Sequence, residues 1–322
     1  MKNFKTFFCC LAGTLALASC SKDRNDAYSN PSLSSIEIIP LTCPVTKAPI
    51  IGTVFPERSM IVAAYYYSPG GNYDETFFSN VVFSKNGTTW TGDKYWPLTG
   101  ELDFLAYSCP SLNPNASYTG TKVTDEVTLA ISDNSSVQED ILFAYAERTN
   151  KISSVSMNFK HAQAMISFKA KSNLNYNAET NTGITITNIT LNGAKYSGTC
   201  VMKNDGNCDW SLLGSQADKP VPGFSPVNLT SSYSAQLGTG ILVPEQDCTS
   251  ITITYTLHNG KQGNSNLDNA GLVHTVNLSS PDTSWVQGKN YCYQINITQT
   301  GISVSPSVTD WVTVNPDTVN IS

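Results

Sequence analysis

The sequence predicts an all-β protein built from two tandem antiparallel β-sandwich domains. Short apolar runs alternate with turn-forming residues, as in "SMIVAAYYY" before "SPGGN" and "SITITYTLH" before "NGKQGN". Runs of this length with closely spaced turns are typical of sandwiches and barrels. Only 14% of the residues are charged, and Ser, Thr and Asn are abundant, as in extracellular β proteins. The chain of 322 residues is too long for one simple sandwich, which favours two.

The predicted strands follow one another along the whole chain. They lie in "SMIVAAYYY", "NVVFS", "LDFLAYS", "VTLAIS", "ILFAYA", "VSMNFKH", "AMISFKAKS", "GITITNITLNG", "YSGTCVM", "TGILVP", "SITITYTLH", "LVHTVNLS" and "NYCYQINITQT". The dipeptides Asn86-Gly87 and Asn259-Gly260 predict hairpin turns. "EDILFAYAERTN" could form one helix, but its aromatic and apolar content also fits a buried strand.

The domain boundary is predicted near residues 147–154, which gives sandwiches over residues 48–152 and 153–322. The polar stretch 172–183 is a rival boundary. We interpret it as a long loop within the second domain, because "FKHAQAMISFKAK" (159–171) is typical of a hairpin.

The N-terminus has the pattern of a secretory signal over residues 1–19. Two lysines precede a short apolar run that ends in small residues, and the run is too short to span a bilayer. "LASC" at its end resembles the bacterial lipobox, in which the cysteine becomes the lipidated first residue. We therefore expect an exported protein anchored to the outer membrane through Cys20.

Two further segments have strand character. "SSIEIIPLT" (34–42) alternates Ile36 and Ile38 and predicts a leader strand within residues 20–47. The C-terminal tail, residues 312–322, spaces apolar side chains in the same manner but is broken by an Asn-Pro-Asp turn. Those side chains are Val312, Val314, Val319 and Ile321. No strand follows the tail to pair with it.

Nine cysteines are present, of which Cys9 and Cys10 leave with the signal and Cys20 takes the lipid. The remaining six permit disulfides in an exported protein. Cys200 and Cys208 flank a predicted hairpin and are the best local candidates, with buried free thiols as the alternative.

Catalysis, cofactors and nucleic-acid binding have little support in the sequence. The net charge of −6 argues against a nucleic-acid partner. Only three histidines are present, and no nucleophile elbow or zinc-binding helix motif occurs. Glu101/Asp103 and Glu139/Asp140 are interpreted as solvated strand ends. "NDGNCD" (204–209) is interpreted as a turn, because the Glu that would complete a calcium loop is missing.

Several stretches in order resemble the fimbrillin family, the subunits of type V pili in anaerobic gut and oral bacteria. They are the lipobox, "VTKAP" (45–49), "KYWPLTGELDFLAYSCP" (94–110), "DILFAYAERTN…VSMNFKHAQAMISFKAK" (140–171) and "YQINITQTGISVSPSVTDW" (293–311). The resemblance implies two transthyretin-like β-sandwich domains and a role as a pilus building block.

The resemblance also implies a mechanism. A trypsin-like surface protease would cut between Lys47 and Ala48, with Arg24 and Arg58 as alternative sites. The leader would leave a groove, and the terminal strand of a neighbouring subunit would fill it by β-augmentation. The tail would be that donor strand, and subunits would join head to tail.

Two other interpretations stay open. One is a non-polymerising surface lipoprotein that binds a glycan or a host protein. The other lies within the family, where the chain could be a tip adhesin or an anchor subunit. The tail argues against the anchor but does not separate stalk from tip.

Overall fold

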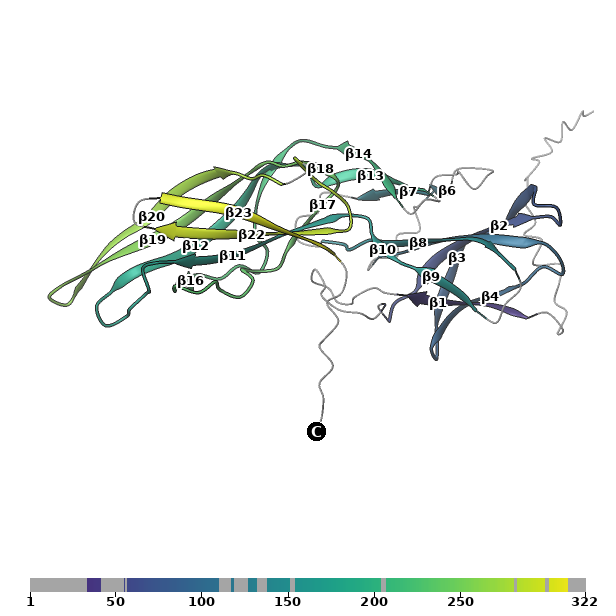
Figure 1. Cartoon of the computed structure of the whole chain (residues 1–322), viewed down its shortest axis with the longest axis horizontal. Coiled ribbons are helices and arrows are strands. Elements are labelled where there is room, and N and C mark those ends of the chain that lie inside the picture. The colour runs from purple at the N-terminus through teal and green to yellow at the C-terminus, as the bar shows by residue number, and fades with distance from the viewer. Residues whose placement is uncertain are drawn as a thin grey trace, which may run out of the picture.

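The computed structural model describes residues 34–41, 55, 57–109, 117–118, 127–131, 138–150, 154–203, 207–280, 283–298 and 301–311. Within these ranges the regular structure is entirely β, and no helix occurs. The molecule is elongated, with two hydrophobic cores in its two ends (Figure 1). The predicted all-β class is confirmed.

An eight-stranded sheet surrounds the core of the first half, shown at the right of Figure 1. Strands β8 and β9 lie in contact across its ends, so the sheet curls around that core. The strand order is β10 (Lys160–His161), β8 (Leu142–Thr149), β5 (Glu101–Ser108), β2 (Met60–Tyr67), β3 (Tyr73–Asn86), β4 (Thr89–Tyr95), β1 (Ser35–Leu41) and β9 (Val155–Asn158).

The central strand β2 is buried on both faces, which explains its continuous apolar sequence. Tyr66 points into the first core, whereas Tyr65 and Tyr67 point into a second cluster on the outer face of the sheet. All three tyrosines are less than a tenth exposed. They are core residues and offer no exposed platform for a sugar.

The second half is a sandwich of two sheets. One sheet has the order β17 (Ile241–Val243), β11 (Ala164–Ser172), β22 (Lys289–Thr298) and β23 (Gly301–Asp310). The other has the order β15 (Ala217–Pro220), β12 (Thr182–Ala194), β19 (Ser250–Gln262) and β20 (Ser265–Asn277), and β16 (Val227–Asn228) also pairs with β12. Alternate residues of the central strands β12, β19 and β22 fill the space between the sheets.

A smaller sheet joins the two halves. Its order is β14 (Cys208–Leu213), β13 (Ser197–Met202), β7 (Val127–Ile131) and β6 (Ser117–Tyr118). Strand β7 from the first half of the sequence therefore pairs with β13 from the second. A two-stranded pair, β18 (Gln246–Asp247) with β21 (Ser284–Trp285), completes the described strands. The two cores follow one another along the chain, but their strands are interleaved.

Three local predictions differ from the structure. Residues 159–171 do not form a hairpin, because β10 pairs with β8 while β11 pairs with β17 and β22. Strands β9 and β10 thus complete the first half, and the second core begins later than residue 153. Asn259-Gly260 lies inside β19 at a register shift, and the turn to β20 falls at Gly263. The Asn86-Gly87 turn is confirmed between β3 and β4.

Pairing is also not purely antiparallel. Strands β1 and β9 are parallel, and so are β11 and β22. Both parallel pairs join segments that are far apart in the sequence, since a tight hairpin can connect only antiparallel neighbours.

Candidate assembly site

The leader strand β1 lies inside the first sheet, between two other strands (Figure 1). It runs antiparallel to β4, with Ile38 opposite Trp90, and parallel to β9, with Ile38 level with Val155. Ile36 and Ile38 are fully buried in the first core, whereas Glu37 and Ile39 on the other face are partly exposed. The predicted leader strand is therefore confirmed as a strand, and we call the space between β4 and β9 the β1 groove.

Backbone hydrogen bonds continue beyond both ends of β1. The Trp96 amide donates to the Ser34 carbonyl at 3.1 Å, and the Phe159 amide donates to the Leu41 carbonyl at 3.2 Å. Burial of each isoleucine contributes about 1.5–3 kcal/mol. Without β1, the facing edges of β4 and β9 would lack their partner and the core would be open to water.

The chain is next described at Phe55, which closes one end of the same core. Its ring contacts Trp90 at a centroid distance of 5.3 Å and Phe159 at 4.6 Å. Glu57 forms an ion pair with Lys85, whose hydrogen bond and charge hold the pKa of the Glu57 carboxyl below its usual value. Residues 42–54, which include Lys47 and Ala48, lie outside the described ranges. That segment links a buried strand to a fixed aromatic residue.

Arg58, the alternative cut site, is held at the rim of the sheet. Its Nε donates to Ser108 Oγ at 2.8 Å, and its Nη2 donates to the Asp140 carbonyl at 3.0 Å. Its own carbonyl accepts from Trp90 Nε1 at 2.9 Å. A protease needs an extended segment that it can draw into its cleft, so these contacts disfavour cleavage at Arg58.

The last described residue, Trp311, is anchored at the junction of the halves. Its indole stacks on His161 with the ring centroids 3.6 Å apart and the planes within 5°. His161 Nδ1 lies 2.7 Å from Asp140 Oδ1, and both side chains are buried. The Trp311 amide donates to the Gly288 carbonyl at 2.7 Å. The tail residues Val312, Val314, Val319 and Ile321 lie outside the described residues, but the point from which the tail departs is fixed.

Sequence reasoning placed β1 but missed the residues that form its groove. The sequence predicts a strand in "VSMNFKH", but nothing local indicates that it lies beside residues 38–41. Trp90 and Phe55 are recognisable in the sequence as aromatic residues, but no pattern around them indicates that they pack beside β1.

No disulfide is formed by Cys200 or Cys208 in the structure, nor by Cys109, Cys248 or Cys292. The predicted hairpin between Cys200 and Cys208 is present, but Cys200 faces Trp210 across it and Cys208 faces Met202. The structure does not form the candidate disulfide. Cys20 lies outside the described residues.

Two acidic residues that were expected to be solvated are buried. Asp103 accepts from Tyr145 Oη at 2.8 Å and from the Arg148 amide at 2.6 Å, and Asp140 holds His161. In the described ranges no cluster of three or more His, Cys, Asp or Glu side chains could hold a metal ion. No helix of the described residues is long and apolar enough to cross a bilayer.

The fold and the inserted leader strand define a class of elongated β proteins whose N-terminal strand is enclosed by chain from elsewhere in the sequence. The profile of the fimbrillin-like family matches residues 53–311, and the chain belongs to this family. The family and the fold support a cell-surface fimbrial subunit with a structural role.

Solved structures share the fold at low sequence identity. A fimbrial protein from Bacteroides vulgatus has a TM-score of 0.63 at 17% identity, covering 79% of this chain and 93% of its own. A candidate cell adhesion protein from Bacteroides ovatus has a TM-score of 0.56 at 14% identity, covering 88% and 100%. A second candidate cell adhesion protein, from Bacteroides uniformis, has a TM-score of 0.53 at 15% identity, covering 87% and 97%. No curated protein matches the sequence.

Proposed function

We propose that this chain is a structural subunit of a cell-surface fimbria of the type V pilus class. It is exported as an outer-membrane lipoprotein precursor anchored through Cys20. A trypsin-like surface protease then cuts between Lys47 and Ala48, and the subunits polymerise head to tail by strand exchange. Membership of the fimbrillin-like family supports the assembly role, and the signal-like N-terminus supports the export route.

The position of β1 is the observation that carries the proposal. Its two neighbours, β4 and β9, both come from the chain that follows Lys47. A cut at Lys47 therefore removes the covalent link between β1 and the strands beside it. Within the described residues, backbone hydrogen bonds and the buried Ile36 and Ile38 then hold β1 in place. Once it dissociates, a groove remains that has strand edges on both sides and an apolar floor. An extended strand from another subunit is the natural occupant.

The tail carries the same pattern as the strand that it would replace. The leader reads Ile36-x-Ile38-x-Pro40, and the tail reads Val312-x-Val314-x-Pro316. Proline is unusual in a central strand, yet Pro40 lies within β1 beside β9, beyond the last residue paired with β4. Pro316 would take the same place, so its presence is compatible with a donor strand.

The exchange replaces the leader strand by a tail of similar sequence. A difference between the two must therefore favour the tail as the final occupant of the groove. The released leader is diluted into the medium, whereas the tail stays attached to its own subunit. Val319 and Ile321 also extend the tail beyond the Val-x-Val-x-Pro match, and each would contribute about 1.5–3 kcal/mol if buried. Because the tail of one copy would fill the groove of another copy of the same chain, the contact would be heterologous. It can propagate into a filament, which favours a stalk subunit.

Brief trypsin treatment of residues 21–322 tests the maturation step. We expect one stable product that begins at Ala48, loss of peptide 21–47, and growth of long multimers seen by light scattering and electron microscopy. The Lys47→Ala variant should yield no product that begins at Ala48 and should remain monomeric. Multimers that form equally well after deletion of residues 312–322 would rule out the tail as donor.

A cross-link tests the register of the exchanged strand. Thr313 would take the place of Glu37, which lies opposite Thr91 in β4 on the partly exposed face. Directly opposed residues of antiparallel strands have the spacing that a disulfide requires. We expect a Thr313→Cys donor to cross-link to a Thr91→Cys acceptor during assembly. A Thr89→Cys acceptor, two residues away on the same strand, is the matched control, and preferential cross-linking to it would contradict the register.

A further inference from the structure

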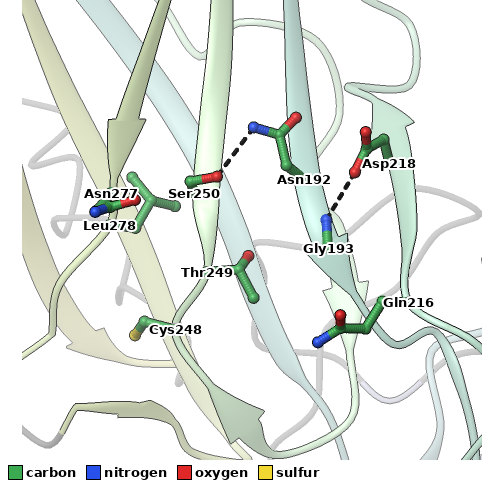
Figure 2. A pocket seen from close by; sticks show the side chains of 9 residues that line it. All are labelled: Asn192, Gly193, Gln216, Asp218, Cys248, Thr249, Ser250, Asn277 and Leu278. Carbon is green, nitrogen blue, oxygen red and sulfur yellow. Dashed lines mark hydrogen bonds between the residues drawn. The ribbon is translucent and has the colours of Figure 1, made fainter.

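A polar cavity of about 570 Å³ lies at one end of the β15-β12-β19-β20 sheet, away from the β1 groove. Its side chains come from the end of β12, the start of β19, the end of β20 and the segment entering β15 (Figure 2). The volume lies in the range of small-molecule sites, about 300–1,000 Å³. Gly193 turns at φ +64°, and a Cβ built on it would meet no atom within 4 Å, so the backbone leaves this side open.

Several polar side chains around the cavity are held in place by hydrogen bonds within the protein and still have acceptor atoms available. Asn192 Nδ2 donates to Ser250 Oγ at 3.0 Å and to Thr252 Oγ1 at 2.9 Å, which leaves its carbonyl oxygen available. One oxygen of Asp218 accepts from the Gly193 amide at 2.8 Å, which leaves the other (Figure 2). Such partly engaged groups are held in place and can still bind a ligand.

Three further polar side chains, Gln216, Thr249 and Asn277, line the cavity. The Thr249 hydroxyl oxygen is shielded from solvent and has no hydrogen-bond partner among the described residues. The amides of Gln216 and Asn277 line opposite sides. The two amides can each donate to and accept from a ligand, whereas the shielded Thr249 hydroxyl lies beyond its reach.

The chemistry of the lining selects a class of ligand. It contains a carboxylate and no basic side chain, which disfavours phosphate, sulfate and other anions. A single carboxylate with amides also falls short of the ligand set that calcium prefers. Amide, hydroxyl and carboxylate groups together suit a neutral molecule whose hydroxyls both donate and accept. Leu278 and Cys248 add a small apolar surface.

We propose that this cavity binds a neutral sugar unit, contacted by Asn192, Gln216, Asp218 and Asn277. The inference is independent of strand exchange, because it uses only side chains of the second sandwich. The cavity is open to solvent and its lining contains no aromatic ring on which a sugar could stack. Binding of one sugar unit is therefore weak, with a Kd in the millimolar range, and it gains strength when many subunits of a filament present the same site.

The thiol of Cys248 supplies a reporter within the cavity itself. The residue is partly exposed, its sulfur lies 3.9 Å from Tyr293 Oη, and burial raises the pKa of the thiol, which slows its alkylation. Residues 21–322 are treated with iodoacetamide at mildly alkaline pH in the presence of galactose, mannose, fucose or N-acetylglucosamine. Modified peptides are quantified by mass spectrometry. Cys292, also partly exposed but outside the cavity lining, is the internal reference, and glycerol controls for nonspecific polyol effects.

We expect at least one sugar to slow alkylation of Cys248 about twofold or more at concentrations near its Kd, with Cys292 unchanged. Asp218→Ala and Asn277→Ala should abolish the protection, whereas Gln262→Ala, at the far end of β19, should keep it. The proposal is overturned if none of these sugars protects Cys248 more than glycerol does. Protection that persists in both the Asp218→Ala and the Asn277→Ala variants overturns it as well.

Discussion

At the scale of single residues, buried tyrosines make the folded state sensitive to alkali. Burial is the main cause that raises the pKa of Tyr107 and Tyr293 above the usual value near 10, and the same holds for Tyr145. In Tyr145 the hydrogen bond to Asp103 adds to the effect. The folded state therefore favours the neutral phenols. Their contribution to stability is complete below pH 10 and is lost as the pH rises from 10 toward the folded-state pKa values.

The contribution of these tyrosines to the free energy of unfolding should accordingly stay constant up to about pH 9.5 and fall above pH 10. Each fully buried phenol adds about 1.4 kcal/mol per pH unit to the fall. Tyr107→Phe should make the fall shallower by that amount, because Tyr107 is fully buried. Tyr233→Phe, at a partly exposed ring, is the control. Urea unfolding at each pH measures the free energy of unfolding, and absorbance at 295 nm measures the formation of phenolate. An equal slope in Tyr107→Phe and wild type would contradict the assignment.

At the scale of single elements, β1 should be the strand most sensitive to its own side chains. Ile38→Ala removes a fully buried side chain in a strand that is held by two neighbours, at a cost of about 2–5 kcal/mol. Amides of residues 35–41 should then exchange faster with deuterium in the uncut precursor, while those of β5 keep their protection. Ile39→Ala, one residue along and partly exposed, should change little. Equal effects of the two variants would mean that burial does not hold β1 in place.

Strands that a local sequence pattern marks could be predicted. Pairings between segments far apart in the chain could not. β2, β5 and β8 were predicted because continuous apolar runs mark buried strands locally. β9 and β10 follow the predicted boundary but lie in the first sheet, because "VSMNFKH" would suit either core equally well. The parallel pairing of β1 with β9, and of β7 with β13 across the halves, depends on segments far apart in the chain. No local pattern encodes such partners. The polar cavity was missed because Asn192, Gly193 and Asp218 have the composition of ordinary turns.

At the scale of the whole molecule, the two halves share a covered surface. Tyr65, Tyr107 and Phe143 of the first sheet pack against Cys200 and Met202 of β13. Hydrogen bonds also cross the junction. Gln138 Nε2 donates to the Gly240 carbonyl at 2.9 Å, and the Leu242 amide donates to Gln138 Oε1 at 2.6 Å. Two independent sandwiches on a linker would not share a hydrophobic cluster of this kind.

The halves should therefore unfold together. Met202 is fully buried in the shared cluster, so Met202→Ala should cost about 2–5 kcal/mol. Although β13 belongs to the later half of the sequence, deuterium exchange should accelerate in β2 and β5 of the first half. Val273→Ala, at an exposed side chain of β20, should stay within about 0.5 kcal/mol of wild type. If Met202→Ala accelerated exchange only in the second sandwich, the halves would be separate folding units. If the halves were independent, loss of β1 would open the first half without changing the stability of the second. If they are coupled, loss of β1 should also destabilise the second sandwich.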